Sequence, residues 1–159
     1  MGILSGPGAA DGIGDGVRAG AQHTVYLTTE RPVIVRDLDE LKTRGAYAER
    51  PGVWTSARYL LREDGVGFTV TQTTVAAGQS QEMAYKYHVE ANLVIEGEGT
   101  LTDLDNGEVY TLSAGSMYCL DQHERHRLDA KTDLRIVCVF TPALVGRETH
   151  DENGSYPIL

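Results

Sequence analysis

The stretch from Gly78 to Gly97, GQSQEMAYKYHVEANLVIEG, decides the fold. A later stretch from Gly107 to His126, GEVYTLSAGSMYCLDQHERH, has a similar pattern. Both alternate as short β-strands do. In the first stretch one parity is mostly apolar and the other is polar. The apolar parity holds Tyr85, Tyr87, Val89, Ala91, Leu93 and Ile95, and the polar parity holds Lys86, His88, Glu90 and Asn92. A polar parity faces either water or the inside of a barrel, and the spacing favours a barrel.

The first stretch resembles the first motif of the cupins, which are small double-stranded β-helix or jelly-roll barrels. That motif is G-x5-H-x-H-x3-E-x6-G. Gly78, Glu90 and Gly97 stand at its glycine and glutamate positions, whereas Ala84 and Lys86 replace its two histidines. The resemblance implies an all-β, single-domain cupin with one or two short helices and a rebuilt site.

The second stretch resembles the second cupin motif, G-x5-P-x-G-x2-H-x3-N. Gly107 and Gly115 are kept, and Ser113, Tyr118 and Gln122 replace the proline, histidine and asparagine. Tyr118 therefore stands where cupins have a histidine.

Length and charge limit the classes of partner. A chain of 159 residues predicts one domain that buries roughly two-thirds of its unfolded surface. A net charge of −9 argues against nucleic acid or an anionic membrane as a partner. No stretch has the length and apolarity of a membrane span, and the N-terminus lacks the pattern of a signal peptide. We therefore expect a cytoplasmic protein.

The pattern divides the chain into three segments. Residues 1–22 are rich in glycine and predict a flexible N-terminal extension. Residues 23–143 predict the barrel, in which residues 23–29 alternate like an edge strand and residues 37–43 suit one or two helical turns. Residues 144–159 are polar without a strand period and predict a lid over the barrel mouth.

Two segments before the first motif predict strands. Residues 54–61 place Trp54 and Arg58 on one face. Residues 68–75 are rich in β-branched side chains, which favour strands. The threonines on one face of this second strand are Thr69, Thr71 and Thr73.

Features nearer the C-terminus predict a turn and a buried strand. Residues 105–107, Asp-Asn-Gly, are a strong signal for a two-residue hairpin turn. Residues 134–140 are almost continuously apolar, which is typical of a strand buried on both faces. Cys119 and Cys138 lie in apolar runs, so we expect two buried free thiols rather than a disulfide.

The chain from about residue 33 to 159 resembles the L-ectoine synthase family. The most specific matches are GSMYCLDQHERH at 115–126 and VGRETHDENGSYPIL at 145–159. The other matching segments are VIVRDLDELK, WTSARYLL followed by GVGF, YHVEA, EGEG and RIVCVF with its following TP.

This resemblance implies a metal site formed by Glu90, Tyr118 and His126. Such a hard oxygen and nitrogen donor set with open positions suits a catalytic Fe(II), with Zn or Mn as substitutes. The residues alone leave alternatives, because Glu90 could be a solvated strand residue and Tyr118 a core residue. His123 lies close to His126 in the sequence, and His88 shares the parity of Glu90 and competes with it as a ligand.

The resemblance also implies a hydro-lyase reaction and a homodimer. N4-acetyl-L-2,4-diaminobutyrate would cyclise with loss of water to ectoine, a compatible solute made under osmotic stress. Arg58 suits the α-carboxylate, Tyr85 a proton donor, Glu148 a base for the amine, and His150 a further catalytic group. The alternatives without a role in catalysis are a surface ion pair for Arg58 and a disordered tail around Glu148 and His150. The positions that match the family's substrate pocket are Trp54, Arg58, Thr73, Tyr85, Cys138, Phe140, Glu148 and His150.

The sequence departs from the family near this site. Tyr87 stands before the His88 position, Asn92-Leu93-Val94 replaces V-Y-C, and Thr71 replaces a different polar residue. These changes bear on the substrate more than on the metal. Two other function classes therefore stay open. One is a related cupin that cyclises or hydrolyses a different N-acyl diamine, and the other is a non-catalytic cupin that binds a small solute.

Overall fold

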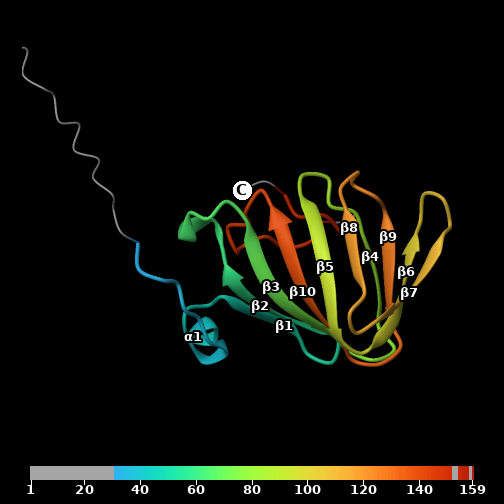
Figure 1. The fold of residues 1–159 in the computed structure, drawn as a ribbon, viewed down its shortest axis with the longest axis horizontal. Helices are drawn as coiled ribbons and strands as arrows, with labels where there is room; N and C mark the ends of the chain where they lie inside the picture. Colours follow the sequence, from blue (N-terminus) through green and yellow to red (C-terminus); the bar gives the residue numbers. More distant parts are fainter. Residues whose placement is uncertain (1–30, 152–153, 158) are drawn as a thin grey trace, which may run out of the picture. The chain divides into compact units, whose positions relative to one another are not determined.

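Two antiparallel sheets face each other in the computed structural model, which describes residues 31–151, 154–157 and 159 (Figure 1). The predicted extension over residues 1–22 and the predicted strand over residues 23–29 lie outside these residues. The larger sheet has the order β1 (Tyr47–Arg50), β2 (Trp54–Leu60), β3 (Thr69–Val75), β10 (Leu134–Thr141), β5 (Val89–Glu96) and β8 (Met117–Leu120). The smaller sheet has the order β4 (Ser80–Met83), β9 (His126–Ala130), β6 (Glu98–Asp103) and β7 (Val109–Ser113).

The prediction of an all-β jelly-roll barrel is confirmed, and so is the short helix. Helix α1 (Leu38–Thr43) begins where Asp37 accepts a hydrogen bond from the backbone N–H of Glu40 at 2.9 Å. Leu41 anchors the helix with a fully buried side chain. A single 3₁₀ turn, Arg62–Asp64, follows β2. Within the described residues, no helix is both long and apolar enough to cross a bilayer.

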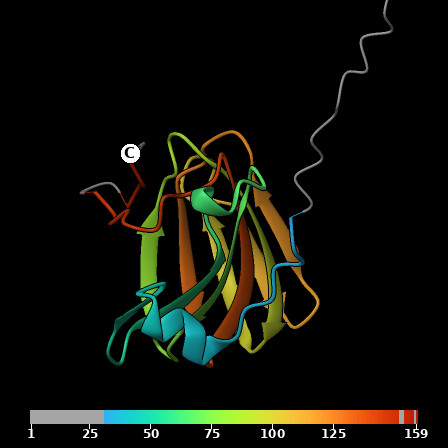
Figure 2. The same cartoon turned by 90° about the vertical axis from the view of Figure 1, so that its left-hand side faces the viewer.

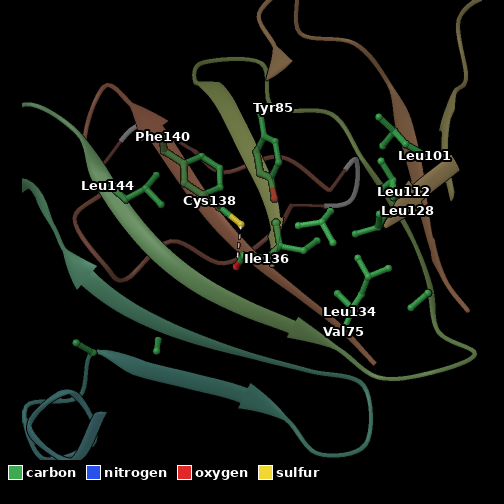
Figure 3. Packing of buried hydrophobic residues seen from close by; sticks show 14 of the residues in the cluster. Val75, Tyr85, Leu101, Leu112, Leu128, Leu134, Ile136, Cys138, Phe140 and Leu144 are labelled. Atoms are coloured by element: carbon green, nitrogen blue, oxygen red, sulfur yellow. Dashed lines mark hydrogen bonds between the residues drawn. The ribbon is translucent and has the colours of Figure 1, made fainter. Parts of the chain in front are cut away.

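The core lies between the sheets and is aliphatic towards one end of the barrel. Figure 3 shows Leu101, Leu112 and Leu128 of the smaller sheet near Leu134 and Ile136 of β10. Val75 lies beside Leu134 in the same view, whereas Tyr85, Cys138, Phe140 and Leu144 lie towards the opposite end and line a pocket.

Gly97 of the first motif closes the turn between β5 and β6. Its φ of 91° lies in the left-handed region, and a Cβ at this position would collide with the backbone carbonyl of Asp133. The motif glycine therefore lets the two strands turn tightly beside the loop that precedes β10.

The prediction that residues 134–140 are buried on both faces is wrong. Strand β10 buries Ile136 and Phe140 on its inner face, but Arg135 and Val139 on its outer face are exposed. In both views, α1 lies near β1 and β2 and leaves the outer face of β10 uncovered (Figures 1 and 2). The expectation of two buried thiols is also wrong in part. Both thiols are free, as predicted, but Cys119 on β8 is exposed and only Cys138 is buried.

The hairpin at residues 105–107 is present but longer than predicted. Strand β6 ends at Asp103 and β7 begins at Val109, so the connection is not a two-residue turn. The Asp103 carbonyl accepts a hydrogen bond from Gly107 N, and its side chain accepts one from Asp105 N, both at 2.8 Å. The Asp103 side chain therefore stabilises a wider loop than the sequence signal indicates.

The strand alternation predicted from residue 85 onwards begins only at Val89. Residues 84–88 form a loop between β4 and β5, which lies at the top of Figure 1. Within β5 the polar parity faces inward, as predicted, with Glu90 and Asn92 buried. Tyr85 is also buried although it has the opposite parity, because the loop breaks the alternation.

Candidate active site

A pocket opens between the two sheets at the end of the barrel where β10 ends. The centre of a water-sized molecule can reach about 60 Å³ of it. The C-terminal segment, red in Figure 1, lies at this end and contributes His150 and Tyr156 to the lining.

One row of inward side chains crosses five strands of the larger sheet. Strand register pairs Arg58 of β2 with Thr71 of β3, and Thr71 with Cys138 of β10. It then pairs Cys138 with Asn92 of β5, and Asn92 with Tyr118 of β8. All five line the pocket. Residues that are far apart in the sequence thus form one continuous floor.

Burial keeps two polar groups on this row, those of Cys138 and Tyr118, in their neutral forms. Burial and the nearby carboxyl of Glu90 raise the pKa of Cys138 to about 12, although hydrogen bonds from Thr71 and Thr73 act in the opposite direction. Burial also raises the pKa of the Tyr118 hydroxyl well above its usual range. In the protein without metal, these side chains act as neutral thiol and phenol.

The next row of the sheet brings a carboxyl into the pocket. Phe140 of β10 pairs with Glu90 of β5, and both line the pocket. Burial raises the pKa of Glu90 to about 8, and the neighbouring Asn92 side chain lowers it by a smaller amount. A carboxylate at this depth needs a cationic partner in order to ionise at neutral pH.

An aromatic cluster holds the hydroxyl of Tyr85 at the pocket mouth. This hydroxyl lies 3.0 Å from Nε2 of His150, and its ring contacts Phe140 edge-on at a centroid distance of 5.3 Å. The backbone carbonyl of Tyr85 lies 2.7 Å from Nδ1 of His123, so the loop after β8 also fixes it. Burial raises the pKa of Tyr85 well above its usual range, which keeps its O–H proton in place.

The three proposed metal ligands lie near Tyr85, but only two of them line the pocket, and His126 does not. Glu90 and Tyr118 line the pocket and both influence the pKa of Tyr85, and the His126 ring lies 6.2 Å from the Tyr85 ring. Nδ1 of His126 bonds the carbonyl of Glu124 at 3.0 Å, so Nδ1 carries the proton and Nε2 presents a lone pair. That Nε2 is buried without a hydrogen-bond partner.

This donor set fits a metal ion with oxygen and nitrogen ligands. A buried carboxyl, a phenol and an imidazole nitrogen without a hydrogen-bond partner are donor types that such an ion accepts. Within the described residues, no three side chains of the His, Cys, Asp or Glu types form a metal cluster. The set contains only two of these types, because Tyr118 supplies the third donor.

Besides His126, two other predicted residues are buried outside the pocket lining. His88 precedes β5, and its two ring nitrogens have no hydrogen-bond partner. Burial lowers its pKa, and Glu148 and Arg62 act on it in opposite directions. Glu148 accepts hydrogen bonds from the backbone N–H groups of Val145 at 2.5 Å and Gly146 at 2.7 Å. In this conformation the carboxylate of Glu148 holds a turn of its own segment.

The remaining predicted pocket positions, Trp54 and Thr73, line the pocket. Sequence reasoning missed Tyr156, whose ring stacks on His150 at 4.4 Å and lies 5.1 Å from Tyr85. Burial raises the pKa of Tyr156 to about 12. The SYPIL run was part of the most specific match to the family, and that was the available signal.

Comparisons with known proteins agree with this architecture. The ectoine synthase family model matches residues 33–159. L-ectoine synthase of Nocardia farcinica is 50% identical over 127 residues, which cover 80% of this chain and 96% of that protein. L-ectoine synthase of Oceanobacillus iheyensis is 46% identical over 128 residues, which cover 80% of this chain and 98% of that protein.

Solved structures give the same result. The crystal structure of ectoine synthase from P. lautus matches with a TM-score of 0.70 and 44% identity, covering 80% of this chain and 91% of that one. An RmlC-like cupin from Shewanella frigidimarina matches with a TM-score of 0.52 at 19% identity over 61% of this chain and 83% of that one, which supports the fold alone. The chain belongs to the ectoine synthase family.

Proposed function

We propose that this protein converts N4-acetyl-L-2,4-diaminobutyrate to ectoine by intramolecular cyclisation with loss of water. The observation that carries the proposal is the row from Arg58 to Tyr118. It offers a guanidinium at one end and the proposed metal donors at the other, with Thr71, Cys138 and Asn92 between them. A short ligand with a carboxylate at one end and an acyl amide at the other suits this arrangement.

The α-amine nitrogen attacks the acetamide carbonyl carbon and forms a new C–N bond, which gives a tetrahedral carbinolamine. Its C–O bond then breaks as the oxygen leaves as water, and a C=N double bond forms, which gives the cyclic amidine. Both hydrogens of that water ultimately come from the substrate nitrogens. The pocket favours ring closure because it holds a flexible ligand with its amine close to its carbonyl.

The chain's own side chains supply binding and proton transfer. Arg58 pairs with the α-carboxylate, and Trp54 and Phe140 wall the apolar part. Tyr85 retains its proton at neutral pH, so its O–H is suited to protonate the leaving oxygen. His150, 3.0 Å away, is placed to return a proton to Tyr85.

The metal that Glu90, Tyr118 and His126 would hold is Fe(II) in this proposal, with Zn or Mn as substitutes, and it supplies Lewis-acid polarisation of the acyl carbonyl. Binding of a cation also stabilises the ionised form of Glu90, which burial alone disfavours.

Glu148 acts through the C-terminal segment in the described conformation. Its carboxylate holds the backbone of Val145 and Gly146, and the carbonyl of Gly146 accepts a hydrogen bond from Arg58. The turn thus fixes the group that binds the substrate carboxylate. A direct role for Glu148 as base towards the amine requires this turn to open, and that role stays a prediction.

We further propose that the enzyme works in the cytoplasm, as a homodimer, in compatible-solute synthesis under osmotic stress. The outer face of the larger sheet supports self-association. Leu93 of β5 is 43% exposed and Met117 of β8 is 66% exposed, and strand register pairs the two. Light scattering of the purified protein measures the oligomeric state, and a strictly monomeric species would contradict the dimer.

The activity is tested with Fe(II)-loaded protein, N4-acetyl-L-2,4-diaminobutyrate and chromatographic detection of ectoine. Ectoine formation that is lost in Arg58→Gln but retained in an outer-face control such as Gln72→Leu supports the proposal. Absence of ectoine from folded, iron-loaded protein would refute it. A parallel incubation with ectoine and with longer N-acyl diamines detects hydrolysis or a different substrate.

A further inference from the structure

We propose that Asn92 is a further catalytic residue, whose side-chain N–H donates a hydrogen bond to the acyl oxygen of the substrate. This inference rests on the proposed cyclisation.

The position of Asn92 places it among the groups that act on the acyl end of the ligand. It lies at the middle of β5, two residues after Glu90 on the same inward face. Strand register sets it opposite Tyr118 on one side and Cys138 on the other. Directly paired side chains on neighbouring strands are roughly 5 Å apart at Cβ. Asn92 is therefore adjacent to two of the three proposed metal ligands.

The amide of Asn92 is buried in the pocket floor. Asn92 is 2% exposed, and Nδ2 has no hydrogen-bond partner at normal distance and angle, although the side chain lies close enough to Glu90 to lower the pKa of that carboxyl. A buried donor without a well-aligned partner destabilises the folded state, and an apolar side chain in its place would carry no such penalty. Nε2 of His126 is buried and unpaired in the same way. Asn92 lines the pocket and can therefore meet a ligand there, whereas His126 lies outside the lining and next to the Tyr85 ring.

The chemistry of the substrate selects the acyl oxygen as the acceptor. Thr71 and Cys138 separate Asn92 from Arg58 in the row, so two strands lie between Asn92 and the guanidinium that would bind the carboxylate. The amine must use its lone pair to attack carbon. The acyl oxygen is the acceptor that remains, and it gains negative charge as the C–N bond forms. A fixed N–H at this point stabilises the transition state more than the ground state.

Asn92 also shares a buried neighbour with Thr71. Thr71 and Asn92 flank Cys138 on its two sides. Both side chains therefore adjoin one buried thiol in the pocket floor. Asn92 adds a donor there, whereas Cys138 remains a neutral thiol because burial raises its pKa.

The test compares Asn92→Leu with wild type and with Gln72→Leu, which removes an amide from the outer face of the same sheet. We expect kcat to fall roughly 100-fold in Asn92→Leu, the size seen when one such donor is removed. Iron content and the thermal midpoint should stay close to wild type. Asn92→Val serves as the second variant if leucine does not fold.

Binding to metal-free protein gives a readout that does not depend on turnover. Calorimetry with the substrate and with ectoine should show weaker binding of the substrate only, because ectoine has lost the acyl oxygen. Unchanged kcat and unchanged substrate affinity in both variants would overturn the inference. Loss of iron in proportion to activity would also overturn it, because Asn92 would then support Glu90 instead. If wild type itself forms no ectoine, the proposed function fails, whereas a failure confined to the Asn92 comparison counts against this inference alone.

Discussion

Replacing Glu148 by glutamine should open the C-terminal segment without unfolding the barrel. The carboxylate accepts two backbone hydrogen bonds, from Val145 at 2.5 Å and from Gly146 at 2.7 Å, and is almost fully buried. A glutamine amide can accept only one of them and turns its own NH₂ towards the other N–H. The turn that holds Arg58 through Gly146 should therefore be weakened.

The magnitude follows from the type of bond that is lost. A hydrogen bond to a charged group contributes about 1.5–3 kcal/mol, and facing donors add a desolvation cost, so the closed turn loses roughly 2–4 kcal/mol. Since each 1.4 kcal/mol is a factor of ten, kcat/KM should fall roughly 30- to 700-fold. KM should rise because Arg58 is released. The midpoint of thermal unfolding should change little, because the segment opens locally.

The assay measures initial rates, thermal unfolding and the rate of limited proteolysis of the C-terminal segment on the same preparation. Glu49→Gln, on the exposed part of β1, is the control. A Glu148→Gln variant with near-normal kcat/KM would refute the role of the turn. A variant that loses kcat while KM and proteolysis stay unchanged would also refute it, and would favour direct action of Glu148 as the base.

Three other outcomes are expected. Glu90→Ala should lose stoichiometric iron and activity together, and full metal retention by that variant would exclude Glu90 as a ligand. Metal-free protein should lose stability between about pH 4.5 and pH 8. The reason is that the native state holds the Glu90 proton up to a pKa of about 8, whereas the unfolded chain releases it at lower pH. The free energy of unfolding from chemical denaturation should therefore fall by up to about 1.4 kcal/mol per pH unit in this range, and Glu90→Gln should remove this pH dependence. Tyr156→Ala should reduce kcat more than Tyr156→Phe, because the ring holds His150 by stacking; equal losses in the two variants would instead assign the effect to the hydroxyl.

The barrel could be predicted because its strands alternate and its motif glycines sit at turns. The inward faces of Glu90 and Asn92 follow directly from parity on β5. Parity failed at Tyr85, since a loop separates it from that strand. The exposure of the outer face of β10 could not be predicted from its apolar residues. An apolar run does not indicate whether another sheet or helix covers each face of the strand.

The site was predicted in its residue types more than in its contacts. Spacing and resemblance brought Glu90 and Tyr118 into one pocket, where the structure also places them. They could not reveal that Glu148 holds its own turn, or that Tyr156 stacks on His150. Such contacts depend on how an irregular segment folds back, and no periodicity encodes that path.

The two thiols of this chain differ in accessibility, so their rates of chemical modification can report motion near the pocket. Cys119 lies on the exposed outer face of the larger sheet, whereas Cys138 lies in the pocket floor with its pKa raised to about 12. Since the thiolate is the reactive form, an alkylating reagent should modify the outer thiol first. The slower labelling rate of Cys138 would then report how often the C-terminal segment opens, and a ligand that fills the pocket should suppress this labelling.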